Sequence, residues 1–542
     1  MHNVQESSQD NSSATRAELP AREENTPQSF QSREAQTKRP KLARNWQYLL
    51  GGGTVLLVVL VIVAGVLSSH SQTPKQPARS VPQKVPTAII ESGSSRTLPV
   101  PTTKPIPSPV SSDHNVSVTV VDGVVYAGTA DNAMYALRMS DGSVLWQTKI
   151  DGAIEESPVV VNGVVYISSF VGQYGPTYLY ALRATDGAVL WRYSGNSYIY
   201  APTVSNGVVY MASQGDGITA LQASDGTRLW HFAAQQGLAY QQPSLVNGTL
   251  YVSTGSSGAP GDVYALRASD GTELWHYKTS DFADTLTVQN GVIYLFSQSK
   301  LSALRANDGH ELWSRPIDTT FEQSPQVIDG VIYFVATKIS LETPTTRNAS
   351  PLPQAMALGT LLWGHGQTAI TGETVPLKAM KPLKEGKSTL YAIRASDGTM
   401  LWQYPMDNGG DSFGGWLQVG HGVIYTSAII AGNNDNTGYI AALQSSDGKV
   451  VWKDKVNGSP AGMSLTGGTI YTTISTANGG AVYALRASDG AMLWNYPISG
   501  TLFGDPIWDN ATLYIGAGNG MVYALRADNG ALSWHYQTNV GF

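Results

Sequence analysis

The chain has 542 residues, enough for about three ordinary domains or for one long repeat array. Charged residues make up 14% of it, against roughly 25% in an average soluble protein, and there are 56 glycines. Tyrosine (27) and tryptophan (13) outnumber phenylalanine (10), as in β-rich proteins with many turns, and unlike coiled coils, disordered chains or polytopic membrane proteins. The net charge of −6 does not favour nucleic-acid binding. The absence of cysteine excludes disulfides, thiolate metal sites and thiol catalysis.

The N-terminal part predicts a membrane anchor. Residues 1–45 are polar and almost free of large apolar side chains, so we expect a disordered tail. The run from Leu49 to Leu67 carries no charge and is long enough for a helix to cross a bilayer. Trp46 and Tyr48 stand where interfacial aromatic residues are expected. We therefore expect a single transmembrane helix within residues 46–69.

The flanking charges predict the orientation of this helix. Lys38, Arg39, Lys41 and Arg44 precede it, whereas the first lysine after it is Lys75. The positive-inside rule places residues 1–45 in the cytoplasm and the rest of the chain outside. A cleaved signal peptide is the alternative, but its n-region would need about 45 residues, and no A-x-A site follows. A lipoprotein anchor is excluded because it needs a cysteine. Residues 70–112 are rich in proline, which favours an extended stalk.

From residue 113 to residue 542 the chain repeats itself. The phrase A-L-R-A-S-D-G-x-x-L-W recurs with small changes, and its tryptophans are Trp146, Trp191, Trp230, Trp275, Trp313, Trp402, Trp452, Trp494 and Trp534. A second phrase, N-G-V-V-Y or a variant, precedes each of them and ends at Tyr126, Tyr166, Tyr210, Tyr251, Tyr294, Tyr333, Tyr425, Tyr471 and Tyr514. Nine copies of each phrase in strict alternation indicate nine units, and a spacing near 40–45 residues is typical of propeller blades.

Each unit reads as four short strands, which we name A to D in chain order. Apolar runs rich in β-branched and aromatic residues alternate with Asn-Gly and Asp-Gly pairs, which supply the positive φ angles of tight hairpins. A four-stranded sheet alone would expose both faces, whereas radial packing of such sheets buries them. The sequence therefore predicts an all-β, multi-bladed propeller.

The A-L-R-A-S-D-G-x-x-L-W phrase resembles the pyrroloquinoline-quinone (PQQ) repeat of quinoprotein dehydrogenases and of the propeller assembly factor of the outer-membrane β-barrel machinery. The resemblance covers residues 113–542. It implies that the nine repeat tryptophans dock between neighbouring blades. Because the family usually builds eight blades, it also implies eight here, with one of the nine units used irregularly; a nine-bladed ring is the alternative.

The order of the strands predicts where function lies. The short A–B and C–D turns share one end of every blade, and the variable B–C and D–A loops share the other, where binding sites are commonly built. The sixth unit carries an insertion at about 338–387, which is either a lid or docking arm or a solvated excursion. The D–A loops should rim the central channel, and their acids and aromatics form a candidate ligand site: Glu155, Glu156, Tyr200, Tyr240, Asp284, Glu322, Asp411, Trp416 and Asp505.

Catalysis is less well supported. The family's alcohol dehydrogenases sandwich PQQ between a tryptophan and a disulfide of adjacent cysteines, which this chain lacks. The nearest calcium-like loops, residues 407–411 and 432–436, lack EF-hand spacing. We therefore expect no catalytic residue, metal or cofactor, with PQQ and Ca²⁺ disfavoured. The favoured interpretation is a membrane-anchored, extracytoplasmic binding or scaffold module for a protein or envelope partner; a quinone-binding oxidoreductase and an extracellular ligand sensor are the alternatives.

Overall fold

The computed structural model of the protein describes residues 96–101 and 115–538, except 173–174, 196, 215, 235–237, 240–241, 257–258, 282, 298–299, 318–319, 322–324, 340–385, 407–411, 414, 431–436, 477–478 and 503. The chain divides into two compact units, Met1–Tyr48 and Leu49–Phe542, and all described residues lie in the second. The predicted tail, membrane helix and most of the stalk thus fall outside the described residues. Within the described residues there is no helix of the length and apolarity that a membrane span requires.

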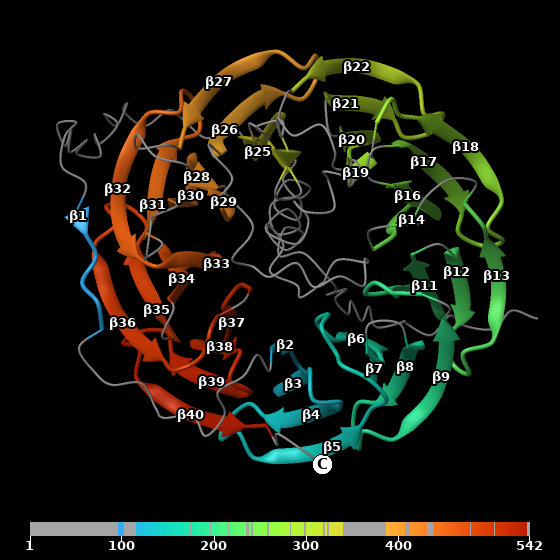
Figure 1. Ribbon diagram of the computed structural model, residues 1–542, viewed down its shortest axis with the longest axis horizontal. Coiled ribbons are helices and arrows are strands. Elements are labelled where there is room, and N and C mark those ends of the chain that lie inside the picture. Colours follow the sequence, from blue (N-terminus) through green and yellow to red (C-terminus); the bar gives the residue numbers. More distant parts are fainter. Residues whose placement is uncertain are drawn as a thin grey trace, which may run out of the picture. The chain divides into compact units, whose positions relative to one another are not determined.

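The described strands form nine antiparallel sheets, which are the blades of a propeller (Figure 1). Blade one contains β2 (Val116–Val121), β3 (Val124–Thr129), β4 (Ala133–Arg138) and β5 (Val144–Lys149). Blade two contains β6 (Val159–Val161), β7 (Val164–Phe170), β8 (Thr177–Arg183) and β9 (Val189–Gly195). Blade three contains β10 (Thr203–Ser205), β11 (Val208–Ser213), β12 (Gly217–Gln222) and β13 (Arg228–Phe232). Blade four contains β14 (Leu238–Ala239), β15 (Ser244–Val246), β16 (Thr249–Ser256), β17 (Ala259–Arg267) and β18 (Glu273–Lys278).

The remaining five blades follow the same plan. Blade five contains β19 (Ala283–Gln289), β20 (Val292–Ser297), β21 (Lys300–Arg305) and β22 (Glu311–Pro316). Blade six contains β23 (Thr320–Phe321), β24 (Gln326–Ile328), β25 (Val331–Ile339), β26 (Gly386–Arg394) and β27 (Met400–Pro405). Blade seven contains β28 (Ser412–Phe413), β29 (Leu417–Gly420), β30 (Val423–Ile430), β31 (Thr437–Gln444) and β32 (Val450–Asn457). Blade eight contains β33 (Ser459–Thr466), β34 (Thr469–Thr476), β35 (Gly479–Arg486) and β36 (Met492–Ile498), and blade nine β37 (Ile507–Asp509), β38 (Thr512–Gly516), β39 (Met521–Arg526) and β40 (Leu532–Gln537).

The two ends of the blades differ in regularity. Every A–B turn has two residues, both with positive φ, as in Asp122-Gly123 and Asn162-Gly163; this is the geometry of type I′ hairpins. Every C–D turn has five residues. The B–C loops vary, from two residues between β16 and β17 to the long segment between β25 and β26. One face of the ring is thus built from uniform turns, and the opposite face carries the loops that differ.

A β-bulge occurs at the same place in all nine blades. The register between strands C and D shifts by one residue immediately before the repeat tryptophan, so that in blade one Ala136 pairs with Trp146 and Leu137 with Val144. The skipped residue, Leu145, is 41% exposed on the outer strand. A bulge of this kind re-aims the side chain that follows it. In each blade the tryptophan that follows the bulge turns towards the next blade.

Each repeat tryptophan joins its blade to the next. Its indole Nε1–H donates to a backbone carbonyl in the C–D turn of the following blade, and its ring packs against the tyrosine of the same unit, with centroids 5.9 to 6.4 Å apart. The nine donor–acceptor pairs are Trp146–Ala184 (2.8 Å), Trp191–Ala223 (2.8 Å), Trp230–Ala268 (3.0 Å), Trp275–Ala306 (3.1 Å), Trp313–Ala395 (3.0 Å), Trp402–Ser445 (2.9 Å), Trp452–Ala487 (2.8 Å), Trp494–Ala527 (2.9 Å) and Trp534–Met139 (2.9 Å).

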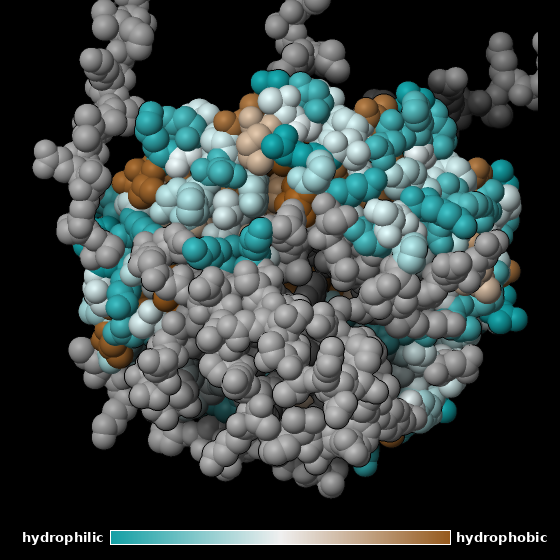
Figure 2. Space-filling model, turned by 45° about the horizontal axis from the view of Figure 1, so that its top comes forward, coloured by the Kyte–Doolittle hydropathy of each residue, from teal (hydrophilic) through white to brown (hydrophobic). Residues whose placement is uncertain are grey.

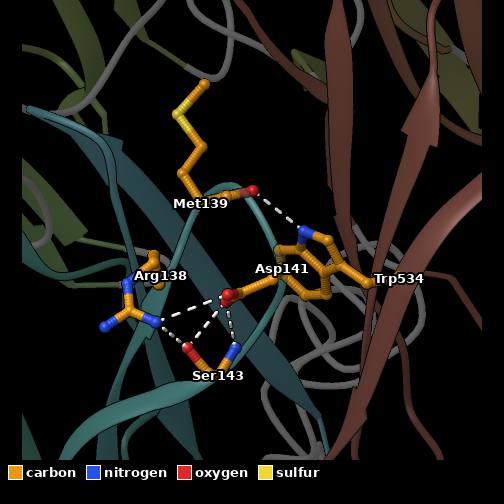
Figure 3. A network of polar contacts seen from close by, with 5 residues as sticks. All are labelled: Arg138, Met139, Asp141, Ser143 and Trp534. Atoms are coloured by element: carbon orange, nitrogen blue, oxygen red, sulfur yellow. Dashed lines mark hydrogen bonds and ion pairs between the residues drawn. The ribbon is translucent and has the colours of Figure 1, made fainter.

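The last of these contacts closes the ring. Trp534 of blade nine donates to the carbonyl of Met139 in blade one, beside the turn in which Arg138 Nη1 and the amide of Ser143 donate to the carboxylate of Asp141 (Figure 3). The equivalent Arg–Asp ion pair recurs in five further C–D turns, and in blade nine Arg526 pairs instead with Asp528, so the repeated arginine stabilises the turn. Among the described strands none is exchanged between the first and last blades, because the four inner-to-outer strands of each blade come from one continuous stretch of chain.

The expectation of eight blades is wrong. All nine units form complete sheets, and all nine tryptophans make the same contact with the following blade, so no unit is used irregularly. The insertion of the sixth unit does not disturb its blade, because β25 and β26 remain paired from Val331 and Arg394 to Ile339 and Gly386. The family precedent fails because the repeated contacts of this chain specify one blade for each copy.

The outer wall of the ring is formed by the D strands (Figure 1). The bulge leucines lie exposed on it, but at intervals of one blade, and Figure 2 shows apolar residues as separate patches among hydrophilic surface. Single exposed apolar residues of this kind are usual on monomeric proteins. On the face that Figure 2 shows, the described apolar residues are therefore scattered rather than continuous.

Candidate functional site

The D–A loops lead from the outer strand of one blade to the inner strand of the next, and they lie on a rigid base. Side chains of the inner strands hydrogen-bond to backbone carbonyls of the neighbouring blade at several junctions. Thr119 Oγ1 donates to Pro158 (2.7 Å), Thr203 Oγ1 to Pro243 (2.6 Å), Gln326 Nε2 to Leu417 (2.6 Å) and Gln418 Nε2 to Met463 (3.1 Å). At these four junctions the bonds fix the inner strands of neighbouring blades relative to one another.

One acidic and aromatic cluster forms at the junction of blades one, two and three. Glu156, in the loop before β6, accepts a hydrogen bond from the hydroxyl of Tyr198 at 3.1 Å. The ring of Tyr198 meets that of Tyr200 edge-on, with centroids 5.0 Å apart, and that of Phe170 at 5.9 Å. Gln214 donates to the hydroxyl of Tyr200 at 2.8 Å. Residues from two D–A loops, from the end of β7 and from the B–C loop of blade three thus meet on the variable face.

The charges of this cluster affect its tyrosines. Burial, together with the carboxylates of Glu156 and Glu155, raises the pKa of Tyr198 far above its usual range. Tyr198 therefore remains neutral and donates its hydroxyl hydrogen bond to the carboxylate of Glu156. Carboxylates beside aromatic faces are suited to cations and to ligands with hydroxyl groups. The cluster can thus recognise a partner that presents a basic or hydroxyl-bearing group.

Asp505 forms a second feature, at the junction of blades eight and nine. Its Oδ1 accepts a hydrogen bond from the amide of Met463 at 2.8 Å. Burial raises the pKa of Asp505 to about 6, and the bond from Met463 opposes that shift only in part. The preceding Gly504 donates to the carbonyl of Ala461 at 3.0 Å, which holds the loop against β33. Asp505 is therefore a carboxyl group that changes charge near neutral pH.

Trp416 belongs to the loop before β29, in blade seven. Its backbone exchanges two hydrogen bonds with Ser427, and its side chain packs at the edge of the core shared by blades seven and eight. This partly buried indole contributes to the packing of its loop, which is a structural use of a residue that we predicted as a binding candidate.

The structure brings only some of the predicted site residues together. Glu155, Glu156 and Tyr200 lie in the cluster at blades one to three, whereas Trp416 and Asp505 lie on other blades. Tyr240, Glu322 and Asp411 lie outside the described residues, as do both calcium-like loops, and of Asp284 only the backbone, in β19, is described. Among the described residues no group of three or more histidines, aspartates or glutamates could hold a metal ion. Sequence reasoning missed Phe170, at the end of β7, and Gln214, in a B–C loop, because nothing in the repeat distinguishes these two positions.

Comparison with protein families shows one match over the whole propeller. The family described as outer membrane protein assembly factor BamB matches residues 100–174, 168–287, 259–428, 355–470 and 436–541. These segments overlap and together extend over the nine blades.

Individual relatives match over shorter stretches. Tetrathionate hydrolase of Acidithiobacillus ferrooxidans is 28% identical over 144 residues, which are 26% of this chain and 25% of the hydrolase. The assembly factor BamB of Salmonella typhimurium is 29% identical over 141 residues, 24% of this chain and 34% of that protein. Among solved structures, the quinohemoprotein alcohol dehydrogenase of Pseudomonas putida HK5 is similar at 15% identity and a TM-score of 0.42, covering 70% of each chain. The matched stretches span about a quarter and a third of the two curated relatives.

Proposed function

The chain belongs to the family described as outer membrane protein assembly factor BamB, and from this premise we propose that its propeller is a non-enzymatic binding or scaffold module for a protein or envelope partner. The partner docks on the variable-loop face. Residues 46–69 anchor the module in the membrane, and the propeller lies outside the cytoplasm. Because the relatives include both an assembly factor and an enzyme, the choice between scaffold and enzyme depends on this chain's own residues.

The contrast between the two faces carries the proposal. All A–B and C–D turns keep one length and one geometry, so that face presents the same short turns around the ring. The other face presents loops of different length and a cluster built from three of them and the end of β7, with Glu156 and Tyr198 at its centre. A rigid frame that carries variable loops is a common way to build a recognition surface.

Cross-linking from defined positions tests this proposal. Ser157, beside the cluster, and Val171, which is 39% exposed in the B–C loop of blade two, are suitable positions for a photo-reactive amino acid. Ser224, exposed in a C–D turn, is the matched control on the opposite face. We expect a discrete adduct with an envelope protein from Ser157 and Val171 and none from Ser224. Equal labelling from all three positions, or no adduct from any, would contradict a partner on the variable face.

An enzymatic role is the alternative, and Asp505 is the observation that favours it. A carboxyl group with a pKa of about 6 is able to donate or accept a proton near neutral pH. Its surroundings argue against a reaction centre, because its carboxylate is engaged by the Met463 amide and no second titratable side chain is shown in contact with it in the described part of the chain. We propose that the protein works without a cofactor.

Calorimetric titration of PQQ with Ca²⁺ into the purified protein decides between these functions. We expect no saturable heat and no change in melting temperature. Saturable binding at micromolar affinity or tighter would contradict the cofactor-free proposal, and would direct further work to dye-linked oxidation of alcohols and sugars.

A further inference from the structure

A short segment before the first blade adds a strand to the outside of the ring. Strand β1 (Arg96–Thr97) pairs in parallel with β32, the outer strand of blade seven, with Arg96 opposite Asp454 and Thr97 opposite Lys455. The amide of Leu98 then donates to the carbonyl of Lys455 at 2.8 Å. Addition of an extended segment to an exposed sheet edge is a recurrent mode of peptide recognition. In Figure 1, β1 lies beside β32 on the outer wall.

The guanidinium group of Arg96 is surrounded by oxygen acceptors of blades seven and eight. Its Nε donates to Asp454 Oδ1 at 2.9 Å, and its Nη2 donates to Asp454 Oδ2 at 3.0 Å and to the carbonyl of Asp489 at 2.6 Å. The side chain of Asp454 is only 1% exposed, whereas that of Arg96 is 50% exposed. Bidentate pairing of this kind is stronger and more specific than a single charged hydrogen bond.

Comparison of the repeats shows that Asp454 is an exception. The residue two positions after each repeat tryptophan is, in chain order, Thr148, Tyr193, Phe232, Tyr277, Arg315, Tyr404, Asp454, Tyr496 and Tyr536. Asp454 is the only acid in this series. A buried carboxylate is strongly unfavourable unless a partner compensates its charge, and burial raises the pKa of Asp454 even though Arg96 acts to lower it. Blade seven thus carries a residue that is costly in the ring itself and is compensated by Arg96.

The apolar residue of the segment is buried against the core of blades seven and eight. Leu98 is 5% exposed and belongs to the core cluster of blades seven and eight, which contains Trp452 and Val456. Asn495 of blade eight donates its side-chain amide to the carbonyl of Pro99 at 3.2 Å. The segment therefore contacts both blades, with a charged contact at Arg96 and an apolar contact at Leu98.

We propose that the outer edge of β32, with Asp454 and the apolar cluster that buries Leu98, is a docking site for an extended Arg-x-Leu segment, and that its occupant is residues 96–98 of the same chain. Docking in this way fixes the N-terminal part of the chain to blades seven and eight, although the covalent connection enters the ring at blade one. A force applied to the chain N-terminal to Arg96 is therefore transmitted to β32, on the outside of blade seven. It does not act directly on β2, the inner strand of blade one. This inference does not depend on which partner the variable face binds.

Limited proteolysis of the full-length protein tests the site. Trypsin cleaves after Arg96 only when the segment leaves β32, because a protease binds its substrate as an extended chain of its own. We expect the variant Asp454→Asn, which keeps the size of the side chain and removes its charge, to be cleaved after Arg96 on the order of tenfold faster than the wild type. Cleavage after Arg79 in the same sample provides the internal reference.

Matched variants separate the site from general effects on folding. Asp447→Asn removes an exposed acid of the same blade that pairs only with Lys449 among the described contacts, and should leave cleavage after Arg96 unchanged. Arg96→Lys keeps a trypsin site and the charge but not the bidentate contact, so its cleavage rate should be intermediate. Equal cleavage after Arg96 in the wild type and in folded Asp454→Asn protein would overturn the proposal.

The concentration dependence identifies the occupant. A segment that docks within its own chain gives the same cleavage rate from micromolar to nanomolar protein. A rate that rises on dilution would show that a second copy supplies the segment, and would overturn the assignment to residues 96–98 of the same chain.

Discussion

Trp534 lies directly against Gly142, and this contact joins the last blade to the first. A Cβ atom on Gly142 would come within 2.6 Å of Cε3 of the Trp534 ring, and Gly142 has a φ of 71°. At the eight other junctions the same pair of residue types meets between blades that are also consecutive in the chain. Only at the Trp534 junction does side-chain packing hold together two blades without a direct chain connection. Closure of the ring therefore depends on non-covalent contacts.

The glycine at this junction should be sensitive to the smallest substitution. Gly142→Ala introduces a strained left-handed residue, at about 1 kcal/mol, and overpacks the Trp534 ring by a further 1–3 kcal/mol, roughly. Gly123→Ala is the matched control, because Gly123 also has a positive φ in blade one and nothing lies within 4 Å of its Cβ position. Urea denaturation should show a clearly larger loss for Gly142→Ala. Equal losses would mean that Trp534 does not pack on this turn.

The docking tryptophans should differ in importance according to their burial. Trp452 is 4% exposed, whereas Trp275 is only partly buried, although both donate to a carbonyl of the next blade. Trp452→Ala should lower the free energy of unfolding by about 3–5 kcal/mol, and Trp275→Ala by less, since its indole loses less buried surface. Thermal denaturation of the two variants measures the difference. An unchanged midpoint for Trp452→Ala would show that the inter-blade contact does not stabilise the ring.

Much of this fold could be predicted from the repeats. The Asn-Gly and Asp-Gly pairs specify turns because few other residues adopt a positive φ, and the tryptophan spacing marks one blade for each copy. The count of nine was therefore visible in the chain, and the precedent of eight blades was the weaker guide. The bulge before each tryptophan was not predicted, although adjacent apolar residues such as Leu145 and Trp146 conflict with simple alternation and could have indicated it.

Features that occur once were harder to predict. The β1 segment lies in a proline-rich stretch that favours an extended spacer, and its docking depends on one acid, Asp454, which stands out only when the copies are compared position by position. The cluster at Tyr198 was predicted in part, because D–A loops converge in any propeller. The contributions of Phe170 and Gln214 depend on loop geometry that sequence patterns do not specify.

The carboxyl group of Asp505 should make stability depend on pH in a characteristic direction. Its pKa is about 6 in the folded protein and ordinarily 3.8, so between these values the folded state holds the proton more tightly than the unfolded state. Its contribution to stability is therefore complete below about pH 3.8 and is lost as the pH rises through 6. After allowance for partial exposure, ionisation at neutral pH costs about 2 kcal/mol.

The variant Asp505→Asn measures this contribution, because an amide oxygen can still accept the Met463 hydrogen bond. Denaturation midpoints should show the variant more stable than the wild type at about pH 7.5 and equal to it at about pH 4. Asp225→Asn is a control of opposite sign: hydrogen bonds from Thr227 lower the pKa of Asp225, so its loss should matter at neutral pH and not in acid. The same difference between Asp505→Asn and wild type at both pH values would contradict the assignment.

The segment 340–385 can be removed without breaking a strand pair, because Ile339 and Gly386 are directly paired at the ends of β25 and β26. Replacing residues 340–385 by an Asn-Gly turn should therefore leave the melting temperature undiminished, since two-residue turns of this kind close antiparallel strands. If the segment is a docking arm, the shortened protein should form less of the photo-cross-linked adduct from Val171, or none. A second variant, in which the sequence of residues 340–385 is scrambled, should lose the adduct to the same extent. An adduct that persists in the shortened protein would show that the partner binds the remaining loops alone. A protein that no longer folds would instead mean that the segment stabilises blade six, which its continuous strand pairing does not require.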